Sequence, residues 1–154
     1  MSKEKITLKG IVTITHLDKD KKVKSIEQHE NLIVNIGRET IAKLFNGLVT
    51  DAFKYLAVGS SSTTESNTQT ALISEITSPT GMSRGLADCS YNNYTAILEK
   101  IFTNDGESNI TVREAGIFNA SSDGQMFSRK VMTDKLLAPN ESLLINWQIQ
   151  FNVA

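Results

Sequence analysis

The chain has 154 residues, of which 40% are hydrophobic and 21% charged, and its formal net charge is −1. This length suits one domain with one core, and the apolar fraction excludes a disordered chain. The balanced charge argues against a nucleic-acid partner, since proteins that bind nucleic acid usually carry a basic excess. No apolar run approaches the roughly 18 residues of a membrane span, and the charged N-terminus lacks the apolar centre of a secretory signal. We therefore expect one domain, residues 1–154, made in the cytoplasm and with no membrane partner.

Two strands and a helix are predicted in the N-terminal third of the chain. Apolar and polar residues alternate over 6–15, and a polar turn at 18–22 leads into a returning strand at 23–35, which together predict a hairpin. Gly37 ends this strand, and apolar residues at helical spacing predict one short helix over 38–45. We expect this helix to pack over one open end of the sheet.

The remaining elements complete a β-rich domain. The run SSSTTESNTQT predicts a polar surface loop at residues 60–70. A shift of phase between Val112 and Ile117, near Gly116, predicts a β-bulge. Apolar residues at period two predict a long final strand from Leu143 to Val153, with Trp147 in the core, and three further strands are predicted at 94–102, 110–118 and 125–132. This spacing predicts a mainly β fold, an antiparallel β-sandwich with one short α-helix.

Residues with the usual catalytic or metal-binding chemistry do not form a recognisable constellation. His16 and His29 are the only histidines, and neither has further ligands at a metal-site spacing, so we interpret both as ordinary polar residues. Cys89 is the only cysteine, which excludes an intrachain disulfide and a cysteine-rich zinc site, and it lacks a nucleophile motif. Nucleotide-binding loops are also missing. We therefore expect a protein that is not an enzyme, with no catalytic residue, metal or cofactor.

Two pairs of residues are candidates for contacts. Arg113 and Glu114 lie within a strand-like run, and we interpret them as a surface alternation or as a structural salt bridge that holds the bulge and the adjoining loops. A hydrolase that uses Glu114 is the weakest alternative. Tyr91 and Tyr94, with asparagines between them, are typical of a sugar-stacking surface and leave a glycan-binding module open. The charged arm at residues 1–5 is expected to be flexible and to strengthen binding to a partner.

Three stretches of the chain stand out in combination. They are Asn31–Gly37, Tyr55–Gly59 with the Ser/Thr loop and residues 70–76 behind it, and Ile110–Asn119 followed by a Gly-containing turn and Met126–Val131. In order and spacing they resemble small virion structural proteins of tailed bacteriophages, of the capsid-decoration or head-fibre type, and they are similar to the N-terminal region of phage tail-collar fibre proteins. The resemblance extends over about Asn31 to Phe151, which is most of the chain.

The resemblance implies a non-enzymatic assembly part of a virion. The expected role is to decorate or stabilise the capsid surface, as a homo-oligomer bound to the major capsid protein. Because the chain ends at Ala154 without a repetitive shaft, decoration is favoured over a full fibre. A fibre-attachment adaptor on the tail or baseplate, with a tail protein as partner, is the first alternative. A carbohydrate-binding β-sandwich is the second.

Overall fold

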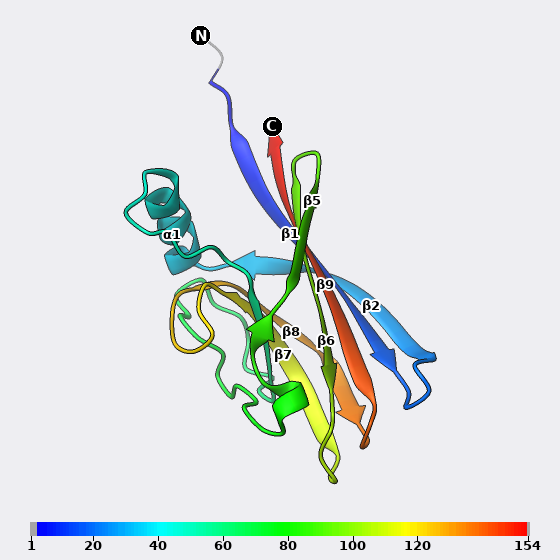
Figure 1. Cartoon of the computed structure of the whole chain (residues 1–154). Coiled ribbons are helices and arrows are strands. Elements are labelled where there is room, and N and C mark those ends of the chain that lie inside the picture. Colours follow the sequence, from blue (N-terminus) through cyan, green and yellow to red (C-terminus); the bar gives the residue numbers. More distant parts are fainter. Residues whose placement is uncertain (1–2, 154) are drawn as a thin grey trace.

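The computed structural model describes residues 3–153, and these form one antiparallel sheet, one α-helix and a short 3-10 helix (Figure 1). The prediction of a mainly β, antiparallel fold with one short helix is confirmed. None of the helices in the described part of the chain is long and apolar enough to cross a membrane. In chain order the elements are β1 Ile6–Leu17, β2 Val23–Ile33, α1 Asn35–Phe45, β3 Tyr55–Gly59, η1 Thr80–Met82, β4 Gly85–Leu86, β5 Asp88–Asn92, β6 Thr95–Thr103, β7 Ile110–Phe118, β8 Met126–Leu137 and β9 Ser142–Val153.

The nine strands form one continuous sheet in the order β4-β3-β7-β8-β2-β1-β9-β6-β5. Strand β2 joins its two halves, because it pairs with β1 for most of its length and then with β8 through Leu32 and Ile33. The two edge strands, β4 and β5, are separated in the chain only by Ala87, whose N–H donates to the Lys54 carbonyl oxygen. The chain thus passes directly from one edge of the sheet to the other, and the sheet is bent into a nearly closed, barrel-like shape.

One core fills the space between the two halves. Val12 and Ile14 of β1 and alternate residues of β6 and β9 face buried side chains of β3, β7 and β8. Trp147 is fully buried in this core, as its phase in the last strand predicts. The two last apolar positions of β9 lie beyond the core, because Phe151 is 39% and Val153 is 70% exposed. The finer prediction of a two-sheet sandwich is not confirmed, since hydrogen bonds link the two halves into a single sheet.

The predicted elements recur with shifted boundaries. The helix begins at Asn35, so Gly37 lies inside it and does not precede it. A Cβ at Gly37 would lie 2.5 Å from the carbonyl oxygen of Phe127, which shows that the glycine allows α1 to approach β8 closely. Strand β2 ends at Ile33, before the predicted end at residue 35, and β8 continues past residue 132 to Leu137.

A register irregularity within the predicted interval and the polar loop are confirmed. The register between β7 and β8 shifts between Val112 and Glu114, and again between Ile117 and Phe118. Val112 and Glu114 are two residues apart, whereas their partners Lys135 and Val131 are four residues apart, so the additional residues lie on β8 and not on β7. Residues 60–70 contain no helix or strand and are mostly exposed. Strands β3, β4 and β5 were not predicted as strands. Of the predicted arm, residues 3–5 are exposed, and residues 1–2 lie outside the described residues.

Candidate functional site

A buried ion pair links β7 and β8, and it joins Glu114 to Arg129 rather than to its neighbour Arg113. Glu114 Oε2 accepts a hydrogen bond from Arg129 Nε at 2.7 Å, and both side chains are fully buried. The alternation of β7 changes phase at the register shift between Val112 and Glu114. Val112 and Ala115, three residues apart, both belong to the core, so Glu114 faces the opposite side of the strand.

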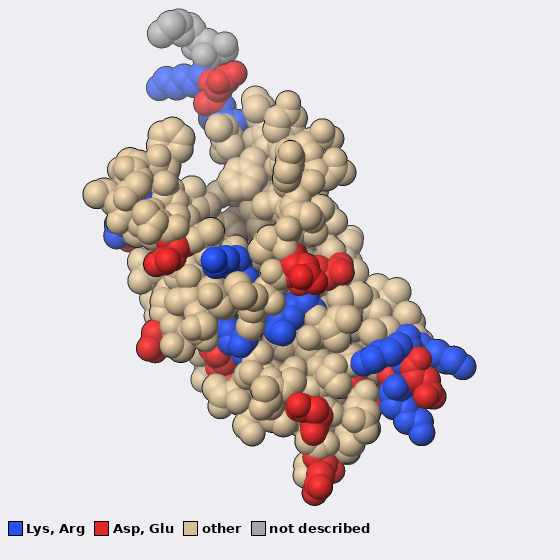
Figure 2. All heavy atoms as spheres, in the orientation of Figure 1, with Lys and Arg blue, Asp and Glu red and all other residues tan. Residues whose placement is uncertain are grey.

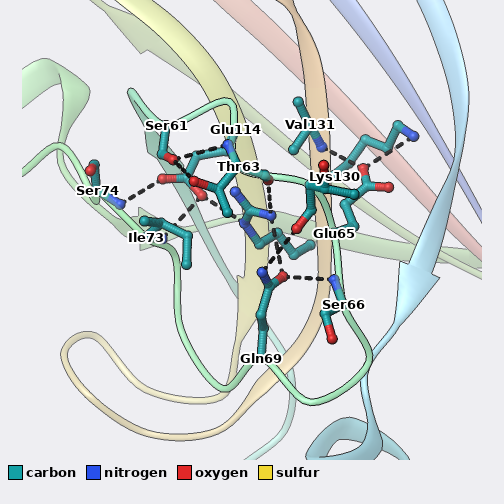
Figure 3. A network of polar contacts seen from close by, with 12 residues as sticks. Ser61, Thr63, Glu65, Ser66, Gln69, Ile73, Ser74, Glu114, Lys130 and Val131 are labelled. Atoms are coloured by element: carbon teal, nitrogen blue, oxygen red, sulfur yellow. Dashed lines mark hydrogen bonds and ion pairs between the residues drawn. The ribbon is translucent and has the colours of Figure 1, made fainter.

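Residues 60–76, here called the strap, cover this ion pair on the outer face of the sheet (Figure 3). Glu114 Oε1 accepts a hydrogen bond from Ser74 N at 2.7 Å, and Oε2 accepts one from Ile73 N at 3.1 Å. Arg129 Nη1 donates to the Thr63 carbonyl oxygen at 2.8 Å. The strap contains no helix or strand. Its hydrogen bonds to the ion pair hold it against the sheet near both of its ends.

Close packing under the strap explains the glycine in the Tyr55–Gly59 stretch. Gly59 of β3 lies opposite Glu114 of β7, and a Cβ at this position would be 2.4 Å from Glu114 Oε1 and 2.6 Å from the Ser74 carbonyl oxygen. Of the stretches on which the predicted resemblance rests, all but Asn31–Gly37 meet here, because β3, the strap, β7 and β8 contribute to the covered ion pair or lie against it.

Arg113 has a different environment from Glu114. Its Nε donates to Asp134 Oδ1 at 3.0 Å, and its Nη1 donates to the carbonyl oxygen of Ser60 at 3.1 Å. Its side chain is 34% exposed, and that of Asp134 is 61% exposed. Arg113 and Glu114 therefore both contact the strap, from different partners, and they do not pair with each other in the described contacts.

An apolar groove of about 380 Å³ lies at one end of the molecule. It opens between α1 on one side and the ends of β6 and β9 on the other. Figure 2 shows a hollow between these two lobes, with uncharged residues on both facing surfaces. None of the ten lining residues is charged: they are Ile41, Leu44, Phe45, Phe53, Ala96, Leu98, Ile117, Phe127, Ile149 and Phe151. The helix thus flanks the open end of the sheet, with its apolar face toward the groove.

Aromatic side chains surround the groove and remain exposed to solvent. Phe45, at the end of α1, is 92% exposed. Tyr94 is 78% exposed, and its carbonyl oxygen accepts a hydrogen bond from Phe151 N at 2.9 Å, which places it beside the groove wall. Tyr91 is 81% exposed and lies directly opposite Ala96, so it points to the same side of the sheet as this lining residue. Both tyrosines singled out in the sequence therefore lie at the rim of this groove, each beside a lining residue, although neither is itself one of the ten.

The groove itself was missed by sequence reasoning, although a signal for it exists. The sequence predicts a helix that packs over one open end of the sheet and a last strand with one face on a core, and these elements contain the apolar residues Ile41, Leu44, Phe45 and Phe151. Their side chains instead line an open groove. The signal that could have indicated an open apolar surface is that apolar positions continue to the last residues of the helix and nearly to the end of the last strand.

The remaining reactive side chains lie apart from one another. Cys89 is on β5, and His16 is on β1, three strands away in the sheet. The spacing across these strands alone is about 14 Å, and the two residues are also offset along the strands. Burial and the neighbouring Asp88 carboxylate raise the pKa of the Cys89 thiol, which disfavours a nucleophilic thiolate. The buried His16 has its Nε2 3.3 Å from Glu141 Oε1. No group of three or more His, Cys, Asp or Glu residues placed to hold a metal occurs within residues 3–153.

Comparison of the chain with protein-family models, with curated proteins and with solved structures finds no match. The resemblance to phage virion proteins therefore stays a prediction from the sequence.

Proposed function

We propose that this protein is a non-enzymatic structural protein of a tailed-phage virion, that it decorates or stabilises the capsid surface, and that the groove end is its assembly surface. The observation that carries the assembly role is the uncharged groove with exposed aromatic residues around it. Contiguous apolar surface of this kind typically marks an interaction site, whereas single exposed apolar residues do not. The virion and the capsid enter the proposal through the sequence resemblance alone.

The environment of Glu114 supports a structural rather than a catalytic role for this residue. Its two oxygens accept three hydrogen bonds, from Arg129 Nε and from the backbone N–H groups of Ile73 and Ser74, and its side chain is fully buried. A general acid or base must lie within hydrogen-bond reach of its substrate. A substrate could reach this carboxylate only after the strap had left the sheet, so the hydrolase alternative loses its best candidate residue.

The proposal is tested by co-sedimentation of the purified protein with phage capsids and, separately, with tails that lack this gene product. Saturable binding to capsids at a fixed copy number is the expected result. Binding to tails alone would replace the decoration role by the adaptor role, and binding to neither particle would contradict a virion role.

The assembly surface is tested in the same assay with the substitution Phe45→Ser. We expect this variant to lose particle occupancy. The matched control is Leu136→Ser, because Leu136 is also exposed, at 54%, but lies on β8 nine residues from the groove residue Phe127, roughly 30 Å along an extended strand. Equal occupancy by the two variants would show that the groove end is not the assembly surface.

A carbohydrate-binding role is the second candidate, and the exposure of Tyr91 and Tyr94 at the groove rim favours it. Tyrosine rings stack on sugars, and the neighbouring Asn92 and Asn93 offer amide groups for hydroxyls. A glycan array followed by titration tests this role. A saccharide that binds the wild-type chain but not the Tyr94→Ala variant would favour the carbohydrate-binding role over particle binding.

A further inference from the structure

We propose that the occupant of the groove is a second copy of this chain, whose Phe45 side chain inserts between α1 and the ends of β6 and β9. This inference rests on the proposed assembly role of the groove end and names its first partner. Three features of the described residues support a copy of the chain as the occupant.

The first feature is that one surface carries both a projecting side chain and a hollow that fits it. Phe45 stands at the mouth of the groove with 92% of its surface exposed, although it is among the residues that line the groove. When two copies of a chain meet through the same patch, each residue that projects must find its receptor on that same patch. A projecting phenyl ring beside an apolar groove meets this condition without any residue from elsewhere on the chain.

The second feature is the amount of exposed aromatic surface. Phe45, Tyr91 and Tyr94 are 92%, 81% and 78% exposed. At about 150–250 Å² per aromatic side chain, they expose roughly 400–600 Å² between them. A stable interface of standard size buries about 800 Å² on each partner. The three aromatic side chains therefore supply half or more of the surface area that one partner buries in such an interface, without the area of the groove walls.

The third feature is charge. A charged patch cannot dock on its own copy without placing like charges together, so a self-associating surface must be neutral or of mixed sign. The groove lining contains no charged residue, and the formal net charge of the chain is only −1. Electrostatic repulsion therefore does not oppose the approach of two groove ends.

The test is the mass of the full-length protein in solution, measured by sedimentation velocity over a range of concentrations. We expect the wild-type chain to associate, and Phe45→Ser to weaken association by at least about 30-fold, as expected when a central aromatic anchor is removed. Leu136→Ser should associate like the wild type. Because Phe45 is almost fully exposed, its replacement leaves the core unchanged, and equal Trp147 fluorescence in the two proteins verifies this.

A second variant tests the groove independently of the projecting ring. Ala96 lies on the groove wall, and Ala96→Phe should fill the groove and also abolish association. In a mixture of the two variants, the Ala96→Phe chain supplies an intact Phe45 ring and the Phe45→Ser chain supplies an open groove. The mixture should therefore associate although neither variant does so alone. A Phe45→Ser variant that associates like the wild type would overturn the inference.

Comparison with particle binding separates this inference from the proposed function. A wild-type chain that stays monomeric at all concentrations but binds capsids would overturn self-association and leave the virion role standing. A chain that associates through Phe45 but binds neither capsids nor tails would support self-association and contradict the virion role.

Discussion

Replacement of Glu114 by alanine is the sharpest test of how the strap is held. The substitution leaves the Arg129 guanidinium buried without its carboxylate, and Arg129 Nη2 already has no hydrogen-bond partner among the described residues. It also removes the acceptor of the Ile73 and Ser74 backbone N–H groups. The expected result is a destabilised domain whose strap is no longer tied to β7.

The magnitude follows from the burial of the pair. Both side chains are fully buried, and removal of one partner from such a pair costs about 3–5 kcal/mol. A domain of this size has a free energy of unfolding of about 5–15 kcal/mol, and each kcal/mol changes its melting temperature by about 2–4 °C. Glu114→Ala is therefore expected to lower the melting temperature by roughly 6–20 °C. Adding Arg129→Met should recover part of this loss, because the unpaired charge is removed.

The assay is equilibrium unfolding in urea, followed by the fluorescence of Trp147, the only tryptophan and a fully buried one. Arg113→Ala is the matched control, because Arg113 adjoins Glu114 and its pair with Asp134 is exposed. An exposed pair contributes less than about 1 kcal/mol. A Glu114→Ala variant within about 1 kcal/mol of the wild type, or no less stable than Arg113→Ala, would refute the reasoning.

Three further substitutions or deletions test other parts of the molecule. In an ordinary helix, replacement of glycine by alanine raises stability by up to about 1 kcal/mol. Gly37→Ala should instead lower stability by about 1–3 kcal/mol, because its Cβ would lie 2.5 Å from the Phe127 carbonyl oxygen. A raised melting temperature would contradict the close packing of α1. Burial by itself raises the pKa of Glu141, but hydrogen bonds, led by that from Lys24, outweigh it and hold the pKa below its ordinary value of 4.5. The stability from this carboxylate is thus present above pH 4.5 and lost as the pH falls through its lower folded-state value; a melting temperature measured against pH should fall less steeply there for Glu141→Gln, and parallel curves would exclude this residue as the cause. Deletion of residues 1–5 should lower particle occupancy in co-sedimentation, and unchanged occupancy would remove the arm from the binding surface.

Local pattern predicted most strands well. Residues 110–118 form β7 as expected, and the alternating C-terminal run forms β9 with its boundary only one residue earlier, at Ser142. Alternation is a property of each strand by itself, so a single sequence reveals it. Strand β5 was missed because all five of its residues are exposed, and its pairing with β6 is what makes it a strand. A strand with no buried face leaves no period-two signal.

The candidate site was less accessible to sequence reasoning. The exposed tyrosines were recognised as a pair, but nothing in their local sequence places them beside Phe45, which is 46 residues away from Tyr91 in the chain and belongs to the helix. The groove exists only because α1 and the ends of β6 and β9 lie across from one another at the open end of the sheet. Such a surface is a property of the assembled elements and not of any one of them.

The sequence by itself determined the β-rich class, the single α-helix, the change of phase within β7 and the polar loop, because each depends on the order of side chains along a short segment. Only the tertiary structure decided that Glu114 pairs with Arg129, that the polar loop becomes a strap tied over this pair, and that the aromatic residues gather around a groove. The physical reason is that alternation reports which side of a strand is apolar, whereas strand register and its shifts decide which distant residue lies opposite.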